Sequence, residues 1–344
     1  MQKYRYIWLY LICGTILLGS GISTQAQHFN EDEGLEFERT KVLSSKKRPG
    51  FMHRPKKPTP AEQLTYADSL RKNDKLKKAA KQYSNLVRHW HEAPEAPQAQ
   101  YSYADVLHER GKYFKSFREY QYLMDHFPGR FSYDEVLKKQ YKVANHIMTS
   151  RRYKFLFFPG FSTPDIAVDF FEKIVKNAPT WENAPKAQFN IGLIQEERKR
   201  YETAARAYGI VQSRYRDSEY AATAFFRKAY CLYKASRSKP RDEKRARNAL
   251  STLSAYTQRY HSDPNVKEVH AMMAQIKEDL AKMYYDRAYF YDKMKTKPLA
   301  AMIMYEDFVK KFPSSELTPM VNERIAELKQ ATAFMENEEN ESIQ

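Results

Sequence analysis

The stretch that decides the fold is NAPKAQFNIGLIQEERKRYETAARAYGIVQSRYRDS, residues 183–218. Its first half places Ala187, Ile191 and Ile194 at helical spacing, and Pro185 suits the first turn of a helix. After a polar break, the second half carries another apolar stripe at helical spacing, from Tyr201 to Tyr215. The stretch therefore predicts two antiparallel helices joined by a short turn.

Small residues mark the place where these two helices touch. Short antiparallel helices approach closely only where the facing side chains are small, which Gly192 and Ala204 provide. This glycine, the alanine twelve residues later and Tyr208 resemble the core of the tetratricopeptide repeat. Gln188 stands where that repeat prefers Trp, and Arg216 where it prefers Pro.

The same pattern recurs from residue 61 to about residue 335, which predicts an array of repeats with local cores. We expect an all-α fold, a right-handed TPR-like α-solenoid of five to six helical hairpins. A long helix over 266–294 precedes the last hairpin, and a capping helix over 316–328 closes the array with Met320, Ile325 and Leu328. The small residues of the first helices are Ala67, Ala104, Ala144, Gly192, Ala229 and Ala288. Their spacing exceeds the usual repeat length of about 34, so loops are inserted or helices are lengthened.

The two ends of the chain lie outside this array. Residues 1–26 read as a signal peptide, with Lys3 and Arg5 before an apolar run and small residues before a cleavage site after Ala26. Residues 27–60 have little apolar periodicity and predict a flexible basic tether. The repeat domain covers 61–335, and the acidic tail over 336–344 is predicted to be disordered.

The chain is strongly basic, with 58 Lys and Arg against 42 Asp and Glu and a net charge of +16. Losing Lys3 and Arg5 with the signal peptide lowers this charge to +14. For an exported protein the expected anionic neighbours are a membrane surface, lipopolysaccharide or an acidic partner, and no nucleic acid. A solvated basic surface without a dedicated ligand is the alternative.

A basic and densely aromatic insertion lies in the turn of the third hairpin. We interpret it as a loop that contacts a membrane or a partner, and the alternative is that it folds back onto the solenoid. Its key residues are Arg151, Arg152, Phe155, Phe157, Phe158 and Phe161.

Several segments together are similar to the BamD family, and the likeness covers about residues 60–330. They are residues 113–122, 126–128, 172–179 and 187–192, together with the long helix before the last hairpin. The resemblance implies a non-enzymatic role in the assembly of β-barrel proteins at the periplasmic face of the bacterial outer membrane. It also implies two partners: a BamA-like barrel protein, and unfolded barrel precursors received by the N-terminal repeats.

One feature departs from that family, whose members usually carry a lipid on a cysteine. Here Cys13 follows the bulky Ile12, and the apolar run continues beyond it. We therefore interpret Cys13 as an ordinary signal-peptide residue and not as a lipid anchor. Attachment to the membrane would then depend on the tether, the aromatic loop or the BamA-like partner.

The first helices of the hairpins are expected to line a concave face that grips an extended peptide. Aromatic residues on this face would suit the aromatic ends of barrel strands, and ordinary packing between repeats is the alternative. The predicted partner-binding residues are Leu64, Asp68, Tyr101, Asp105, Tyr141 and Asn145.

The sequence predicts no catalytic residues, no metal site and no cofactor, because it contains no zinc-protease, phosphate-loop or nucleophile motif. Two other classes stay open. One is a periplasmic scaffold for peptidoglycan or cell-division machinery, similar to the CpoB family, although the coiled-coil heptads of that family are not evident in residues 27–60. The other is the superhelix of a lytic transglycosylase, which lacks here the catalytic domain that follows it in those enzymes.

Overall fold

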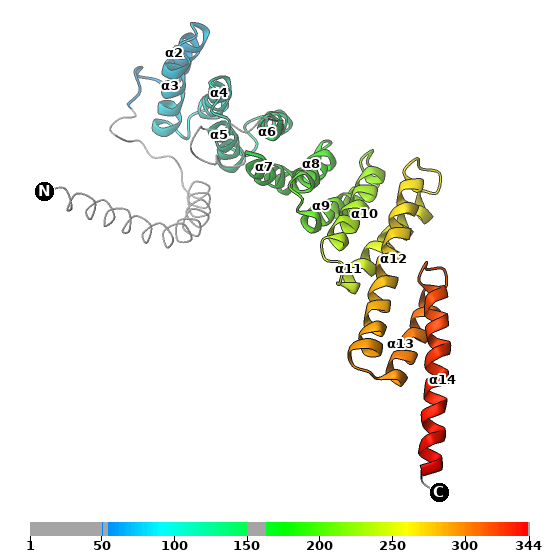
Figure 1. Ribbon diagram of the computed structural model, residues 1–344. Coiled ribbons are helices and arrows are strands. Elements are labelled where there is room, and N and C mark those ends of the chain that lie inside the picture. Colours follow the sequence, from blue (N-terminus) through cyan, green and yellow to red (C-terminus); the bar gives the residue numbers. More distant parts are fainter. Residues whose placement is uncertain (1–49, 51–53, 150–162, 343–344) are drawn as a thin grey trace, which may run out of the picture. The chain divides into compact units, whose positions relative to one another are not determined.

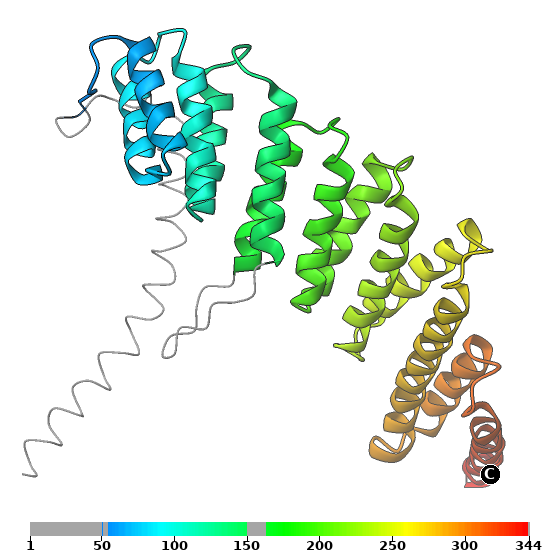
Figure 2. The ribbon, with the colours of Figure 1, turned by 90° about the horizontal axis from the view of Figure 1, so that it is seen from above.

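The computed structural model describes Gly50, residues 54–149 and residues 163–342. These residues form thirteen α-helices and one short π-helix, and the described part of the chain contains no strand (Figures 1 and 2). Within each of the two units described below, successive helices pack on one another in chain order, as the predicted all-helical TPR solenoid requires. The chain divides into two compact units, residues 1–146 and 147–344.

The first unit contains two helical hairpins and a fifth helix. Its helices are α2 (Pro60–Lys72), α3 (Leu76–His89), α4 (Ala96–Glu109), α5 (Tyr113–His126) and α6 (Tyr133–Thr149), the last of which runs past the unit's end. Helix α2 pairs with α3 and α4 with α5, and α3 joins the two hairpins by packing on α4. The hairpins predicted around Ala67 and Ala104 are thus confirmed.

The second unit continues the same scheme with longer helices. It comprises α7 (Thr163–Asn177), α8 (Ala184–Glu197), α9 (Tyr201–Arg214), α10 (Ala221–Arg237), α11 (Glu243–Arg259), α12 (Val266–Tyr289), η2 (Phe290–Met294), α13 (Pro298–Lys311) and α14 (Thr318–Ser342). Each helix from α7 to α14 packs on its neighbour in the chain. Helices α10 and α11 have 17 residues each, against 14 in each of α8 and α9.

The turns inside the hairpins share one backbone geometry. Asp74, Gly111 and Lys199 each follow a first helix with φ of 54°, 68° and 58°. The next amide closes the turn on the helix, as Lys75 N–H does to Leu70 O at 2.8 Å and Lys112 N–H to Leu107 O at 2.8 Å. Only one of these left-handed positions holds the glycine that best suits it, so glycine is a poor guide to the turns in this chain.

The turns between hairpins are equally uniform. A residue just after the second helix donates its N–H back to that helix. The first helix of the next hairpin begins the same number of residues after this one in every turn. Arg216 follows one of these residues, Tyr215, whose N–H donates to Val211 O at 2.9 Å. The turn therefore keeps its geometry although Arg216 replaces the preferred proline. The residues that end the second helices are Trp90, Phe127, Ala178, Tyr215, Tyr260 and Phe312.

The C-terminal elements differ in detail from the expectation. The long helix α12 ends at Tyr289, and a π-helical turn replaces its last residues up to Met294. In the capping helix α14, Ile325 and Leu328 face the core as predicted, but Met320 is exposed, because Val321 is the residue that shares their helical face. The helix continues to Ser342, through most of the tail that was predicted to be disordered, since no Pro or Gly interrupts it after Pro319.

The contact at Gly192 is tighter than the sequence indicates. A Cβ atom added there would lie 2.4 Å from Tyr208 Cε1, and its three nearest atoms all belong to that ring. The aromatic ring of α9, and not Ala204 alone, is what excludes a side chain on α8. Gly209, on the outer side of α9, meets nothing closer than Lys228 Cε at 3.7 Å.

We predict that Gly192→Ala destabilises the α8–α9 hairpin by about 1–3 kcal/mol, because the fully buried Tyr208 has no room to move away. Gly209→Ala, also within a helix, should be neutral or stabilising by up to about 1 kcal/mol. Hydrogen exchange of the α8 and α9 amides measures both changes. Equal protection in the two variants would contradict the close contact.

A buried ion pair fixes the last helix. Asp292, on η2, has a side chain only 3% exposed, and its two carboxylate oxygens accept from Arg324 Nη2 and Nε of α14, each at 2.8 Å. The bonds from Arg324 outweigh burial and hold the pKa of Asp292 below its ordinary value. Tyr305 of α13 reaches the same carboxylate at 3.4 Å.

Because the folded pKa of Asp292 is lowered, its contribution to stability is complete above the unfolded pKa of about 4 and is lost as the pH falls below that value. We predict that Arg324→Gln destabilises the C-terminal helices by about 1–3 kcal/mol at neutral pH and by much less at about pH 3. Thermal unfolding at the two pH values measures this. Lys329→Gln, which removes an exposed pair of α14 with Glu306 of α13, is the control and should change little.

Candidate protein-binding surface

A buried glutamine recurs in the first helix of four hairpins, four positions before the small residue. Its amide donates to the second helix, as Gln100 Nε2 does to Glu119 O at 2.8 Å and Gln188 Nε2 to Ala207 O at 3.1 Å. Gln63 does the same to Gln82 O at 3.2 Å. In the third case Gln140 Nε2 donates to Gln121 Oε1 of the preceding hairpin at 3.2 Å. A polar clamp thus stands where the repeat usually has an apolar tryptophan.

Four second helices also send a buried tyrosine hydroxyl to a carboxylate on, or just after, the first helix. In the first unit the acid directly follows the small residue: Tyr83 donates to Asp68 Oδ1 at 2.5 Å, and Tyr120 donates to Asp105 Oδ1. Burial, reinforced by the negative charge of Asp105, raises the pKa of Tyr120, so this phenol stays a protonated donor. These bonds fix the rotamers of acids that lie on the outer face of α2 and α4.

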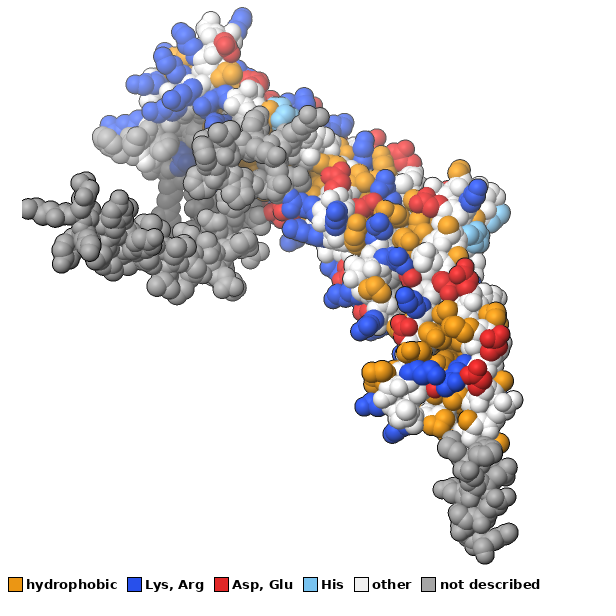
Figure 3. All heavy atoms as spheres, in the orientation of Figure 1, with side chains coloured by type: hydrophobic (Ala, Val, Ile, Leu, Met, Phe, Trp, Pro, Cys, Tyr) orange, Lys and Arg blue, Asp and Glu red, His pale blue; other side chains and the backbone are white. Residues whose placement is uncertain are grey.

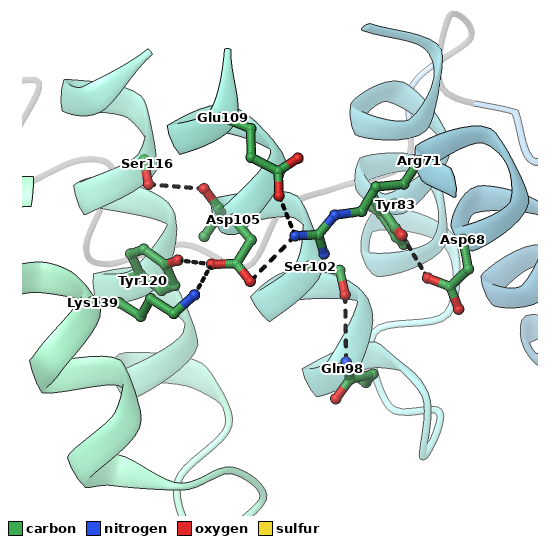
Figure 4. A network of polar contacts seen from close by, with 11 residues as sticks. Asp68, Arg71, Tyr83, Gln98, Ser102, Asp105, Glu109, Ser116, Tyr120 and Lys139 are labelled. Carbon is green, nitrogen blue, oxygen red and sulfur yellow. Dashed lines mark hydrogen bonds and ion pairs between the residues drawn. The ribbon is translucent and has the colours of Figure 1, made fainter. Parts of the chain in front are cut away.

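Three first helices are tied together by charges around Asp105 (Figure 4). Its carboxylate accepts from Lys139 Nζ of α6 at 2.7 Å and lies 3.6 Å from Arg71 Nη2 of α2, which also pairs with Glu109. Partial burial disfavours the charged form of Lys139, but the bond and attraction to Asp105 outweigh this and raise its pKa. We call the surface formed by Asp68, Arg71, Tyr101, Asp105 and Lys139 the helix A face.

The six predicted partner-binding residues are not equivalent in the structure. Asp68 is exposed, and Leu64, Tyr141 and Asn145 are half-buried. Tyr101 is also half-buried, with its ring 5.9 Å from that of Tyr120 and Lys139 Nζ 5.6 Å from its centroid. Asp105 is 9% exposed and is engaged by three internal partners, so its main role is to hold the helix A face together.

Sequence reasoning missed Arg71, Glu109 and Lys139, because their partners lie more than thirty residues away and no local pattern pairs them. The glutamine clamp had a visible signal, since Gln63, Gln100, Gln140 and Gln188 all precede a small residue by the same interval.

The end of the predicted flexible tether is held against the first hairpin. Lys56 N–H and Lys57 N–H both donate to Gln63 Oε1, at 2.9 and 3.0 Å, and Asn85 Nδ2 donates to Arg54 O at 2.9 Å. Gln63 is fully buried, so these amides satisfy an oxygen that water cannot reach. Residues 54–57 therefore belong structurally to the repeat domain.

Several predictions fall outside the described residues: the signal peptide with Cys13, most of the tether, and the aromatic loop with Arg151, Arg152, Phe155, Phe157, Phe158 and Phe161. Within the described ranges, no group of three or more His, Cys, Asp or Glu side chains could hold a metal ion. None of the helices in those ranges is both long enough and apolar enough to cross a membrane.

Paired helices with small residues at their contacts, short uniform turns and local cores define a helical-repeat scaffold. Two sequence models of the tetratricopeptide repeat match the chain, over residues 64–123 and 186–218. These are the α2–α5 and α8–α9 regions. The chain therefore contains tetratricopeptide repeats over these residues, and such repeats bind proteins and peptides. Among curated proteins, no match was found.

Solved structures with similar repeats include a tetratricopeptide repeat protein from Parabacteroides merdae, at 10% identity, covering 78% of this chain and 98% of that one with a TM-score of 0.30. The C-terminal part of a TPR repeat-containing protein from Cytophaga hutchinsonii is 14% identical, with coverages of 86% and 98% and a TM-score of 0.33. YrrB, a TPR protein with an unusual peptide-binding site, is 15% identical, with coverages of 62% and 90% and a TM-score of 0.28. The assignment of the repeats rests on the two sequence models.

We predict that Asp105→Ala loosens the first unit by about 1–3 kcal/mol, because it removes the acceptor of the Tyr120 hydroxyl and the partner of Lys139. Asp68→Ala, which removes an exposed acid with a single tyrosine donor, should have the smaller effect. Hydrogen exchange of the α4 and α5 amides reports the loss. Equal effects of the two variants would contradict the central role of Asp105.

Proposed function

We propose that this protein is an exported scaffold that binds unfolded β-barrel precursors on its helix A face and docks on a BamA-like barrel protein during outer membrane assembly. The proposal includes a location at the periplasmic face of the outer membrane. Its support is the BamD-like sequence segments together with the tetratricopeptide repeats of the first unit. It requires binding only, and no bond chemistry.

The observation that carries the binding part is the charge network across α2, α4 and α6. Arg71 and Lys139 keep 31% and 40% of their side chains exposed while their charged groups are held by Asp105. An extended peptide lying across the three helices would meet fixed cations and carboxylates that can bond its polar backbone. Because these side chains are ordered beforehand, binding loses little side-chain entropy.

Tyr101 supplies an aromatic surface beside those charges. Its ring is ordered by Tyr120 beneath it and by Lys139 over it, and it remains half-exposed. Barrel precursors have strands of alternating apolar and polar residues with aromatic residues near the membrane interface. An aromatic side chain of such a strand could pack on Tyr101 while its backbone meets the neighbouring charges.

A periplasmic scaffold for peptidoglycan or cell-division machinery would use the same face with a different client. Affinity purification of the protein from envelope extracts separates the two roles. Recovery of a BamA-like barrel protein supports barrel assembly. Recovery of cell-division or peptidoglycan proteins without any barrel-assembly component would favour the alternative.

We predict that Tyr101→Ala weakens binding of a peptide copied from the C-terminal strand of a barrel protein by about 1–2 kcal/mol, because it removes an ordered aromatic contact. Phe114→Ala removes an aromatic ring that is 43% exposed on α5, away from the helix A face, and should leave the affinity unchanged. Fluorescence anisotropy of a labelled peptide measures both. An unchanged affinity of the Tyr101 variant would show that the peptide does not bind to this face.

A further inference from the structure

A basic groove lies on the side of the first unit opposite the helix A face. It is a hollow of ≈ 200 Å³ over α4, between α3 and α5. On α4 the groove residues Tyr103 and Leu107 each lie two positions after Tyr101 and Asp105 of the helix A face. Residues two positions apart in a helix point to opposite sides, so the two sites occupy opposite faces of α4. Its cations are Lys77 and Lys81 on α3, Arg110 at the end of α4 and Lys115 on α5.

The charge of this groove is not compensated locally. No acidic residue lines it, and among the described residues no ion pair involves its four cations. Helix α3 contains no Asp or Glu. The acid one turn beyond Lys115 is Glu119, which is 8% exposed and accepts from Gln100 at 2.8 Å. Four positive side chains therefore surround one hollow that no acidic side chain lines, and one acid, Glu119, lies close behind it.

The second unit provides a comparison, because a similar groove lies there among α9, α10 and α11. It is lined by Arg206, Lys228 and Arg245, but also by Glu202, which pairs with Arg245. Lys228 Nζ donates to Gln212 Oε1 at 3.1 Å. Glu202 stands two residues before the small Ala204, where the first unit has Lys77 before Ala79. At the position of the acid that neutralises the second groove, the first groove thus carries a lysine.

The positive charge extends beyond the hollow. Lys72, Lys75 and Lys78 lie at the α2–α3 turn, and Lys112 directly precedes α5 beside Arg110; except for the half-buried Arg110, all are exposed. The pair between Arg71 and Glu109 shows that these two turns are neighbours. Figure 3 shows Lys and Arg gathered over α2 and α3. Such a broad, open cationic edge suits a charged surface better than an enclosed small molecule.

We propose that the basic groove of Lys77, Lys81, Arg110 and Lys115 binds the phosphate headgroups of anionic phospholipids and so holds the first unit against a membrane surface. The signal peptide predicted at residues 1–26 favours lipid over nucleic acid as the source of phosphate. The inference goes beyond the proposed client binding, because it uses other residues on the opposite face of α4. It stands whether or not barrel precursors are the clients.

The test is sedimentation of the full chain with phosphatidylglycerol-containing vesicles and with pure phosphatidylcholine vesicles. The wild-type protein should bind the anionic vesicles alone, and less at higher salt. The variant with Lys77, Lys81, Arg110 and Lys115 all changed to Gln should lose on the order of fivefold in affinity for each cation removed. Lys77→Glu, which copies the acid of the second groove, should weaken binding more than Lys77→Gln.

The matched control removes the same charge from the second unit, through Arg206→Gln, Lys228→Gln, Lys239→Gln and Arg241→Gln. It should keep most of the vesicle affinity, and circular dichroism checks that both quadruple variants are folded. An equal loss in the two would show a dependence on net charge alone and overturn the site. Binding of inorganic phosphate that depends on the four residues, without vesicle binding, would overturn the lipid assignment. Peptide binding measured on the same variants tests the client function separately.

Discussion

The structure depends on one recurring contact, in which a large aromatic ring of the second helix lies across a small residue of the first. The largest fully buried side chains include five tyrosines, one each on α3, α5, α9, α11 and α13. The ring fills the space between the two helices, and at Gly192 it leaves no room even for a Cβ atom. Each such contact belongs to a local core that also includes the helix following the hairpin, so the array needs no common core.

A buried tyrosine hydroxyl needs an acceptor, and for four of the five tyrosines a carboxylate provides it, at a different position in the two units. In the first unit the acceptor directly follows the small residue, as Asp105 follows Ala104. In the second it lies one turn later, as Glu196 does for Tyr208 and Asp292 for Tyr305. Three of these acids also pair with a cation: Asp105 with Lys139, Glu196 with Arg227 and Asp292 with Arg324. Part of the charged surface of the array therefore follows from the carboxylates that accept hydrogen bonds from buried tyrosines.

Much of the fold could be predicted from the sequence, because small residues, tyrosines and helix stops are local signals. The predicted small residues Ala67, Ala104, Ala144, Ala229 and Ala288 are all fully buried. What could not be predicted depends on contacts across the array. The chain gives no sign that Asp105 would be enclosed by Arg71 and Lys139, and this changes its role from a contact residue to an organising one. The π-helical turn after Tyr289 likewise has no distinct local pattern.

The bonds between residues 54–57 and the first hairpin determine where the folded domain starts. The helical pattern begins at Pro60, yet Gln63 and Asn85 take partners from the extended chain before it. This short segment acts as a strap over the exposed edge of α2 and α3, which no preceding helix covers in the described chain. A fragment that began at the first helical residue would leave the Gln63 oxygen buried without a donor. The natural boundary for an independently folding piece therefore lies before Arg54.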